Sequence, residues 1–137
     1  MPKCYAFDVD ECLETSNGPV SIQMLKDLHD KGHIVGICGN LSAFLPKVPD
    51  WHRFISFTMN FDFGYNGGYL GSLVPKWMWL HCFQHVAKPA ADEFIMVGNQ
   101  RGRINSKGFT CGSWDDQAAA QAGWRFILED DFANGAR

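Results

Sequence analysis

The sequence lacks several features that would place it in a familiar class of protein. No apolar stretch approaches the roughly 20 residues of a membrane-spanning helix, and the N-terminus does not have the charged-then-apolar pattern of a secretory signal. No two cysteines are spaced CxxC, which excludes a zinc ribbon and a thioredoxin-like redox motif. P-loop, GxGxxG and nucleophile-elbow motifs are also missing. We therefore expect a cytoplasmic protein that does not contact membranes.

Neither sign of charge dominates the chain. Twelve basic and fifteen acidic side chains give a net charge of −3, so no general attraction to nucleic acid or to a membrane surface is implied. The five cysteines are odd in number and scattered, which favours reduced thiols over a disulfide framework. With 137 residues, 46% of them apolar, the chain is long enough to bury a core, and we expect residues 1–137 to form a single domain.

Short apolar runs alternate with amphipathic stretches along the chain. The expected strands are residues 4–8, 33–38, 53–59, 93–97 and 124–128. The expected helices are residues 20–31, 76–86 and 115–122. This alternation predicts an α/β fold, a three-layer sandwich around a mostly parallel, five-stranded Rossmann-like sheet.

Two stretches do not fit the alternation. Residues 61–75 are rich in glycine and aromatic residues without a helical period, and they predict a hairpin or a loop over the carboxyl edge of the sheet. Residues 100–114 are long for a structureless connection, so we expect a small hairpin or a functional loop there. Arg101, Arg103 and Lys107 form a basic cluster in this second stretch that is able to meet a second phosphate or a nucleic-acid backbone.

The most informative local feature is a pair of carboxylates at the end of the first expected strand. Asp8 and Asp10 follow this apolar run, at the edge where open α/β sheets bind their ligands. Strand alternation directs both to one side of the chain and Val9 to the other. Two like charges about 4 Å apart repel by roughly 4 kcal/mol at an effective dielectric near 20. The pair therefore indicates a bound cation or a shared proton, with a solvated acidic turn as the alternative.

Four segments, in order, resemble the motifs of the haloacid dehalogenase superfamily of phosphotransferases, and the resemblance covers nearly the whole chain. They are Phe7-Asp8-Val9-Asp10-Glu11-Cys12-Leu13, the run that ends Cys38-Gly39-Asn40, Lys76 at a helix start, and Val97-Gly98-Asn99 followed by Asp115 and Asp116 on an alanine-rich helix. The resemblance implies the sheet of that superfamily. A large cap domain is not expected, because only one helix fits between the first two motifs and residues 41–75 are too few for a large lid.

This resemblance also implies an activity and a role for each motif. The expected protein is a Mg²⁺-dependent phosphomonoester hydrolase that acts through an aspartyl-phosphate intermediate. Asp8 would be the nucleophile and Asp10 the general acid and base. Lys76, or less suitably Lys88, would fix the phosphoryl group. The implied phosphate-binding residues are Cys38, Gly39 and Asn40, and the implied Mg²⁺ ligands are Asp8, Asp10, Asn99, Asp115 and Asp116.

Three positions depart from the family pattern. Cys38 replaces a hydroxyl that normally binds a phosphoryl oxygen, and a thiol is a weak donor. Asn99 replaces an aspartate, so its oxygen brings no charge to a cation. Glu11 stands where glycine is common, and we expect it to face solvent. These departures leave a second interpretation open: a catalytically weakened relative that binds a phosphorylated ligand or a partner without turnover. The expected substrate is a small phosphorylated molecule, with a nucleotide or a nucleic-acid 3′-phosphate as one option.

Overall fold

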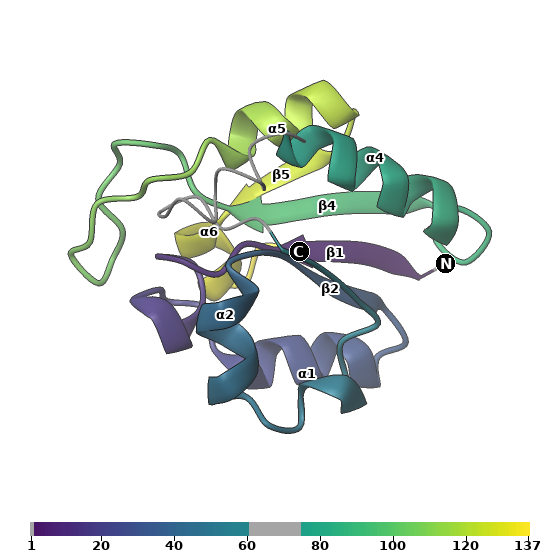
Figure 1. The fold of residues 1–137 in the computed structure, drawn as a ribbon, viewed down its shortest axis with the longest axis horizontal. Coiled ribbons are helices and arrows are strands. Elements are labelled where there is room, and N and C mark those ends of the chain that lie inside the picture. The colour runs from purple at the N-terminus through teal and green to yellow at the C-terminus, as the bar shows by residue number, and fades with distance from the viewer. Residues whose placement is uncertain (1, 61–74) are drawn as a thin grey trace.

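The computed structural model describes residues 2–60 and 75–137. These residues contain a five-stranded sheet in the order β3-β2-β1-β4-β5, in which every neighbouring pair is parallel (Figure 1). The strands are β1 (Lys3–Phe7), β2 (Ile34–Gly39), β3 (Phe57–Asn60), β4 (Glu93–Gly98) and β5 (Arg125–Leu128). The expected α/β fold with a parallel sheet is confirmed. Because β1 is central, the residues that follow it emerge in the middle of the carboxyl edge.

The three expected helices are present, and further short helices accompany them. The helices are α1 (Ile22–Asp30), α2 (Leu41–Phe44), α4 (Lys76–Ala87), α5 (Asp115–Ala122) and α6 (Glu129–Ala133). Single turns of 3-10 helix occur at η1 (Glu14–Ser16), η2 (Leu45–Lys47) and η3 (Trp51–Arg53). The sequence did not predict α2, α6 or these turns, because a segment of three to five residues is too short to show a helical period.

The side chains of the strands divide between two faces of the sheet. Tyr5 and Phe7 belong to an apolar cluster that includes buried residues of α1, α2 and α6. Cys4 and Ala6, the alternate residues of β1, belong to a second cluster with buried residues of α4 and α5. Helices therefore cover both faces, as the ribbon in Figure 1 shows, and the arrangement is a three-layer sandwich.

The stretch 100–114 folds as a small antiparallel turn. Ile104 and Thr110 form a β-bridge, and the amide of Gly102 donates to the carbonyl of Cys111 at 2.8 Å. The expectation of a small hairpin is thus confirmed. The hairpin or loop expected at residues 61–75 lies outside the described residues, apart from Pro75. None of the described helices is long and apolar enough to cross a membrane.

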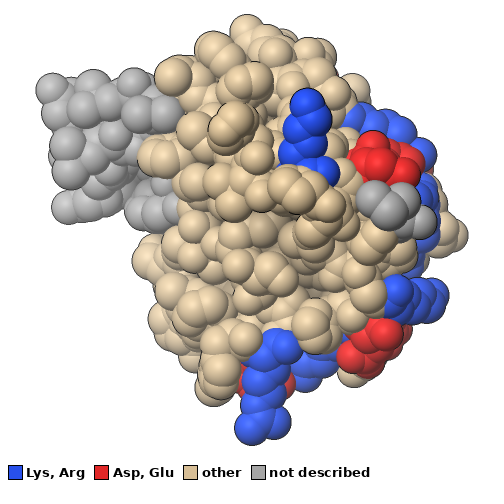
Figure 2. Space-filling model, turned by 90° about the vertical axis from the view of Figure 1, so that its right-hand side faces the viewer, with Lys and Arg blue, Asp and Glu red and all other residues tan. Residues whose placement is uncertain are grey.

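Charges on the amino side of the sheet are mixed in sign. Figure 2, which shows the right-hand side of Figure 1, has Lys and Arg side chains spread around the face, several of them beside Asp or Glu. Glu93, the first residue of β4, pairs with Lys3 at 3.9 Å and with Arg125 at 3.3 Å. The described residues form no continuous basic patch on this face.

Candidate functional site

Polar residues follow four neighbouring strands where each strand ends. Asp8 follows β1, Asn40 follows β2, Asn99 follows β4 and Glu129 follows β5. Since all four strands are parallel, these residues share the carboxyl edge of the sheet, in the order of β2, β1, β4 and β5. Asp8, Asn99 and Glu129 are buried. The edge therefore gathers polar groups that lie out of contact with bulk water.

A buried lysine joins two of the acids. Lys76, the first residue of α4, is 7% exposed. Its Nζ lies 3.1 Å from Asp8 Oδ1 and 2.6 Å from Asp115 Oδ1. Burial by itself lowers the pKa of Lys76, but the Asp115 and Asp8 carboxylates outweigh it and hold that pKa above its ordinary value. Lys88, the alternative candidate, is an exposed residue at the far end of α4.

Asp115 is brought next to Asn99 despite the stretch that separates them in sequence. Its Oδ2 accepts from the backbone N–H of Asn99 at 2.9 Å, and its own N–H donates to the Asn99 carbonyl at 3.2 Å. A Cβ at Gly98 would come within 2.3 Å of Asp115 Oδ2, so this approach requires glycine. Burial, and then the Asp8 charge, raise the pKa of Asp115 to about 7 against the lowering effect of Lys76.

The second motif presents glycine, and not the thiol, to Asp8. Cys38 is fully buried in the apolar cluster beneath α4 and α5, and burial raises its pKa to about 12. A Cβ at Gly39 would lie 2.8 Å from Asp8 Oδ1 and 2.9 Å from the amide nitrogen of Val9. The position that faces the carboxylate thus has no room for a side chain. A ligand at this point would meet the backbone of Gly39 and not the thiol.

Asn40 is oriented toward the second carboxylate of the DxD motif. Its Nδ2 lies 3.5 Å from Asp10 Oδ2, and its Oδ1 accepts from the hydroxyl of Ser42 at 2.6 Å. Because the hydroxyl occupies the amide oxygen, the NH₂ group is the one that faces Asp10. Ser42 was missed from the sequence, since its contact depends on the short helix α2.

Among the buried oxygens at this edge that have no partner in the described residues, two lie on neighbouring strand ends. Asp8 Oδ2 and Asn99 Oδ1 are buried and accept no hydrogen bond. The Nδ2 of Asn99, in contrast, donates to the carbonyl of Glu11 at 3.2 Å. A buried acceptor left unpaired costs about 1–3 kcal/mol. Both atoms are acceptors of the kind that hard cations prefer, so what they can bind is a hydrogen-bond donor or a cation.

The predicted metal ligands are only partly brought together. Within residues 2–60 and 75–137, no three His, Cys, Asp or Glu side chains group closely enough to hold a metal ion. Both oxygens of Asp115 are already used, one by Lys76 and one by the Asn99 amide. Asp116, the next residue, is half-buried, and its Oδ1 has no hydrogen-bond partner in the described part of the chain. Unless Asp116 contributes, any cation here would therefore rely on Asp8 and on uncharged oxygens.

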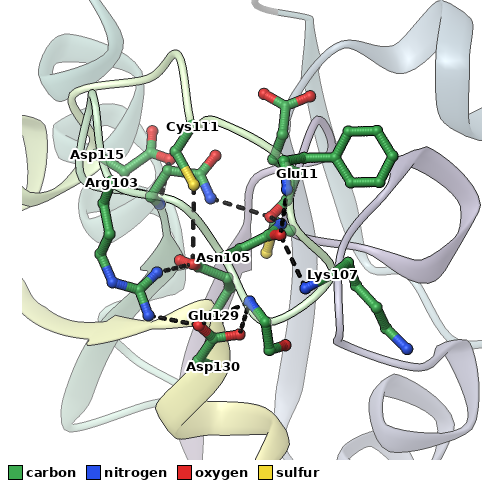
Figure 3. A network of polar contacts seen from close by, with 12 residues as sticks. Glu11, Arg103, Asn105, Lys107, Cys111, Asp115, Glu129 and Asp130 are labelled. Atoms are coloured by element: carbon green, nitrogen blue, oxygen red, sulfur yellow. Dashed lines mark hydrogen bonds and ion pairs between the residues drawn. The ribbon is translucent and has the colours of Figure 1, made fainter.

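The basic cluster expected in the stretch 100–114 is divided. Arg103 forms ion pairs with Glu129 and Asp130 (Figure 3). Arg101 instead lies over the exposed ring of Trp114, 4.3 Å from its centroid. Arg103 therefore links residues 100–114 to the start of α6, directly after β5, and its guanidinium is not part of an open basic surface.

Glu11 is half-buried, so it faces solvent only in part. Its carbonyl accepts from the side chain of Asn105 at 3.0 Å, and from Asn99 (Figure 3). Its φ of 55° lies in the left-handed region, which explains why glycine suits this position. Burial, and then the charge of Asp10, raise the pKa of Glu11.

Glu129 is a second site residue that the sequence did not reveal. It is fully buried, and its Oε2 has no hydrogen-bond partner in the described structure. Burial raises its pKa, while Arg103 and the Asn99 side chain lower it. The signal that could have identified it is its place directly after an expected strand, which it shares with Asp8 and Asn99.

Comparison of the chain with models of known protein families, with curated proteins and with solved structures gave no match. The function is therefore argued from the site itself.

Proposed function

We propose that this protein is a Mg²⁺-dependent phosphomonoester hydrolase that acts through an aspartyl-phosphate on Asp8. The proposed fold class is the sheet of the haloacid dehalogenase superfamily without a large cap. The observation that supports this most is the state of the Asp8 carboxylate. Lys76 fixes its Oδ1 at 3.1 Å, while its Oδ2 is buried without a partner in the described structure. An acid that is held on one oxygen and free on the other is suited to attack.

A phosphate monoester is anionic, so the site has to supply positive charge to bind it. A phosphate monoester reacts very slowly without help, and catalysis depends on positioning and on positive charge around the phosphoryl group. Lys76 supplies one positive charge at the edge of the sheet. Asp115 holds this lysine at 2.6 Å, so we assign it to positioning Lys76 and not to binding the substrate.

The proposed reaction has two steps. A carboxylate oxygen of Asp8 attacks phosphorus, and the leaving oxygen departs with a proton from Asp10. Asp10 then removes a proton from water, which attacks the aspartyl-phosphate, releases inorganic phosphate and regenerates Asp8. The contact of Asn40 with Asp10 Oδ2 at 3.5 Å supports a defined place for this acid and base.

Asp8, the backbone carbonyl of Asp10 and Asn99 would hold Mg²⁺, with Asp116 as a further candidate. The unpaired oxygen of Asn99 supports this choice, because Mg²⁺ accepts amide as well as carboxylate oxygens. When bound, the ion supplies positive charge that reduces the repulsion between Asp8 and the phosphoryl group. With one carboxylate and one amide on the ion, we expect weaker binding than at a site with several acids.

The surface beside the site suggests the class of substrate. Arg101 and Trp114 flank the motif in sequence, two residues after Asn99 and one before Asp115, and Trp114 is 49% exposed. An exposed indole beside a guanidinium can stack on a flat ring. We propose a nucleotide or a nucleic-acid 3′-phosphate as the substrate, to be tested by a screen of phosphorylated metabolites, nucleotides and 3′-phosphorylated oligonucleotides.

The test of the proposed activity is hydrolysis of p-nitrophenyl phosphate with Mg²⁺ and with EDTA. Turnover that needs the metal and is lost in Asp8→Asn supports the hydrolase. The second candidate, a weakened relative that binds a phosphorylated ligand without turnover, is favoured by Asn99 and by the small number of grouped acids in the described residues. Calorimetric titration separates the two, because no binding up to millimolar Mg²⁺ supports the inactive protein.

A further inference from the structure

Asn99 lies between two carboxylates at the edge of the sheet. Gly98 of β4 pairs in register with Leu128 of β5, so Asn99 and Glu129 are the next residues beyond a paired position. The sheet order β1-β4-β5 places Asp8 on one side of Asn99 and Glu129 on the other. Asn99 and Glu129 are both fully buried. A buried acid therefore stands directly beside the position where the charge of the fourth motif is missing.

Glu129 belongs to a group that retains one excess negative charge. Arg103 forms ion pairs with both Glu129 and Asp130, so one cation faces two carboxylates (Figure 3). The thiol of Cys111 also approaches Glu129 Oε1, at 3.8 Å. The contact with a guanidinium favours the ionised carboxylate. Glu129 Oε2 is left without a hydrogen-bond partner in the described structure.

The same arrangement fixes the orientation of the Asn99 amide. A carboxylate only accepts hydrogen bonds, so it favours the NH₂ side of a neighbouring amide and repels the oxygen. The Nδ2 of Asn99 also donates to the carbonyl of Glu11 at 3.2 Å. The bond to Glu11 and the negative charge of Glu129 both favour an amide whose Oδ1 is turned away from Glu129, and this is the oxygen that has no hydrogen-bond partner in the described structure.

We infer that Glu129, the first residue after β5, is a positioning residue that supplies the negative charge that Asn99 lacks, and that it directs Asn99 Oδ1 toward the cation beside Asp8. The inference rests on the proposed function, since the cation is the one proposed there. The inference also explains why position 99 is an asparagine and not an aspartate. An aspartate at position 99 would place a second buried carboxylate against Glu129, which has one guanidinium to share with Asp130.

The test exchanges the charge between the two positions. The variants are Glu129→Gln, Asn99→Asp and the double variant with both changes, and the readouts are calorimetric Mg²⁺ binding and the thermal midpoint without metal. We expect Glu129→Gln to weaken Mg²⁺ binding about 10- to 100-fold, as loss of an outer partner of a ligand does. Asn99→Asp alone should lower the midpoint. The double variant again has one carboxylate in the pair, now at position 99, and it should recover both the Mg²⁺ affinity and the thermal midpoint.

Glu93→Gln is the matched control. It removes a carboxylate at the amino end of β4, where Glu93 pairs with Lys3 and Arg125, and it should leave the Mg²⁺ affinity within about twofold of the wild type, in contrast to the 10- to 100-fold loss expected for an outer partner. Equal Mg²⁺ affinity in Glu129→Gln and wild type overturns the inference and leaves the proposed function standing. A double variant that shows the sum of the single effects, or that does not fold, overturns it as well. If the wild type binds no Mg²⁺, the inference and the proposed function fall together.

Discussion

Lys76 Nζ lies 3.1 Å from Asp8 Oδ1 in a buried ion pair, although 68 residues separate the two in sequence. Asp115 binds the same ammonium at 2.6 Å, so two carboxylates share one cation. The group carries an excess negative charge when both acids are ionised. It would repel a phosphate ester unless a further positive charge joined it. This imbalance is the physical reason for expecting a divalent cation next to Asp8.

Removal of the buried ammonium should destabilise the fold. In Lys76→Met, the Asp8 and Asp115 carboxylates would face each other without a cation, and breaking a buried pair in this way costs about 3–5 kcal/mol. Urea unfolding of the metal-free protein measures the loss. The double variant Lys76→Met and Asp115→Asn removes one carboxylate as well and should recover part of the stability. A single variant as stable as the wild type would show that Lys76 does not balance these acids.

Gly39→Ala should impair activity. The new Cβ would lie 2.8 Å from Asp8 Oδ1 and 2.9 Å from the amide nitrogen of Val9, and the backbone there cannot yield freely. The Asp8 carboxylate would have to move, and a displacement of about 1 Å lowers the rate about 100-fold. The measurement is kcat/KM for p-nitrophenyl phosphate. Gly112→Ala is the control, since no atom lies within 4 Å of its Cβ, and it should keep full activity.

The stability of the metal-free protein should fall as the pH rises from about 4 to about 7. The pKa of Asp115 is about 7 in the folded protein against an ordinary value of 3.8, so the folded state binds more protons in this window. One such group contributes at most about 1.4 kcal/mol per pH unit. Unfolding by urea across this range, compared with Asp115→Asn, isolates the effect. A variant with the same slope as the wild type would contradict the assignment.

Glu11→Gly should stabilise the protein. A residue other than glycine in the left-handed region destabilises the folded state by about 1–2 kcal/mol. Glycine has more conformational freedom in the unfolded chain, which offsets about 0.5–1 kcal/mol of the stability gained by removing this strain. The expected net gain is therefore about 0.5–1 kcal/mol, read from urea unfolding. Asn17→Gly is the matched control. Asn17 has a φ of 68°, and asparagine tolerates this conformation, so little change is expected there.

The repeating elements of the fold were predictable because burial imposes a period on the sequence. Residues 93–97 were expected as a strand from their apolar run, and β4 covers Glu93–Gly98. Residues 115–122 were expected as a helix, and α5 has these bounds, with acids in its first turn and Gly123 at its end. The short helices α2 and α6 were not predicted, because their few residues are placed by tertiary contacts and not by a sequence pattern of their own.

The site was predictable only where a residue's place in a motif determines its neighbours. Asp8, Lys76 and Asp115 were all named from the sequence, and the structure brings them into contact. Arg103 was expected in an open basic cluster, but it turns inward to Glu129. The direction of a side chain on an irregular loop depends on distant partners, which the local sequence does not contain.

The most direct test of the central claim is to trap the phosphoryl group on Asp8. In Asp10→Asn, the leaving group can depart as p-nitrophenolate, which needs no proton donor, whereas the water of the second step loses its base. Acid quenching during turnover, followed by peptide mass spectrometry, should find one added phosphoryl group on the peptide with Asp8. The group should be missing from the double variant Asp8→Asn and Asp10→Asn. Two results together would contradict the account. One is that Asp10→Asn carries no such adduct although the wild type hydrolyses the substrate with Mg²⁺, and the other is that Asp8→Asn keeps this hydrolysis.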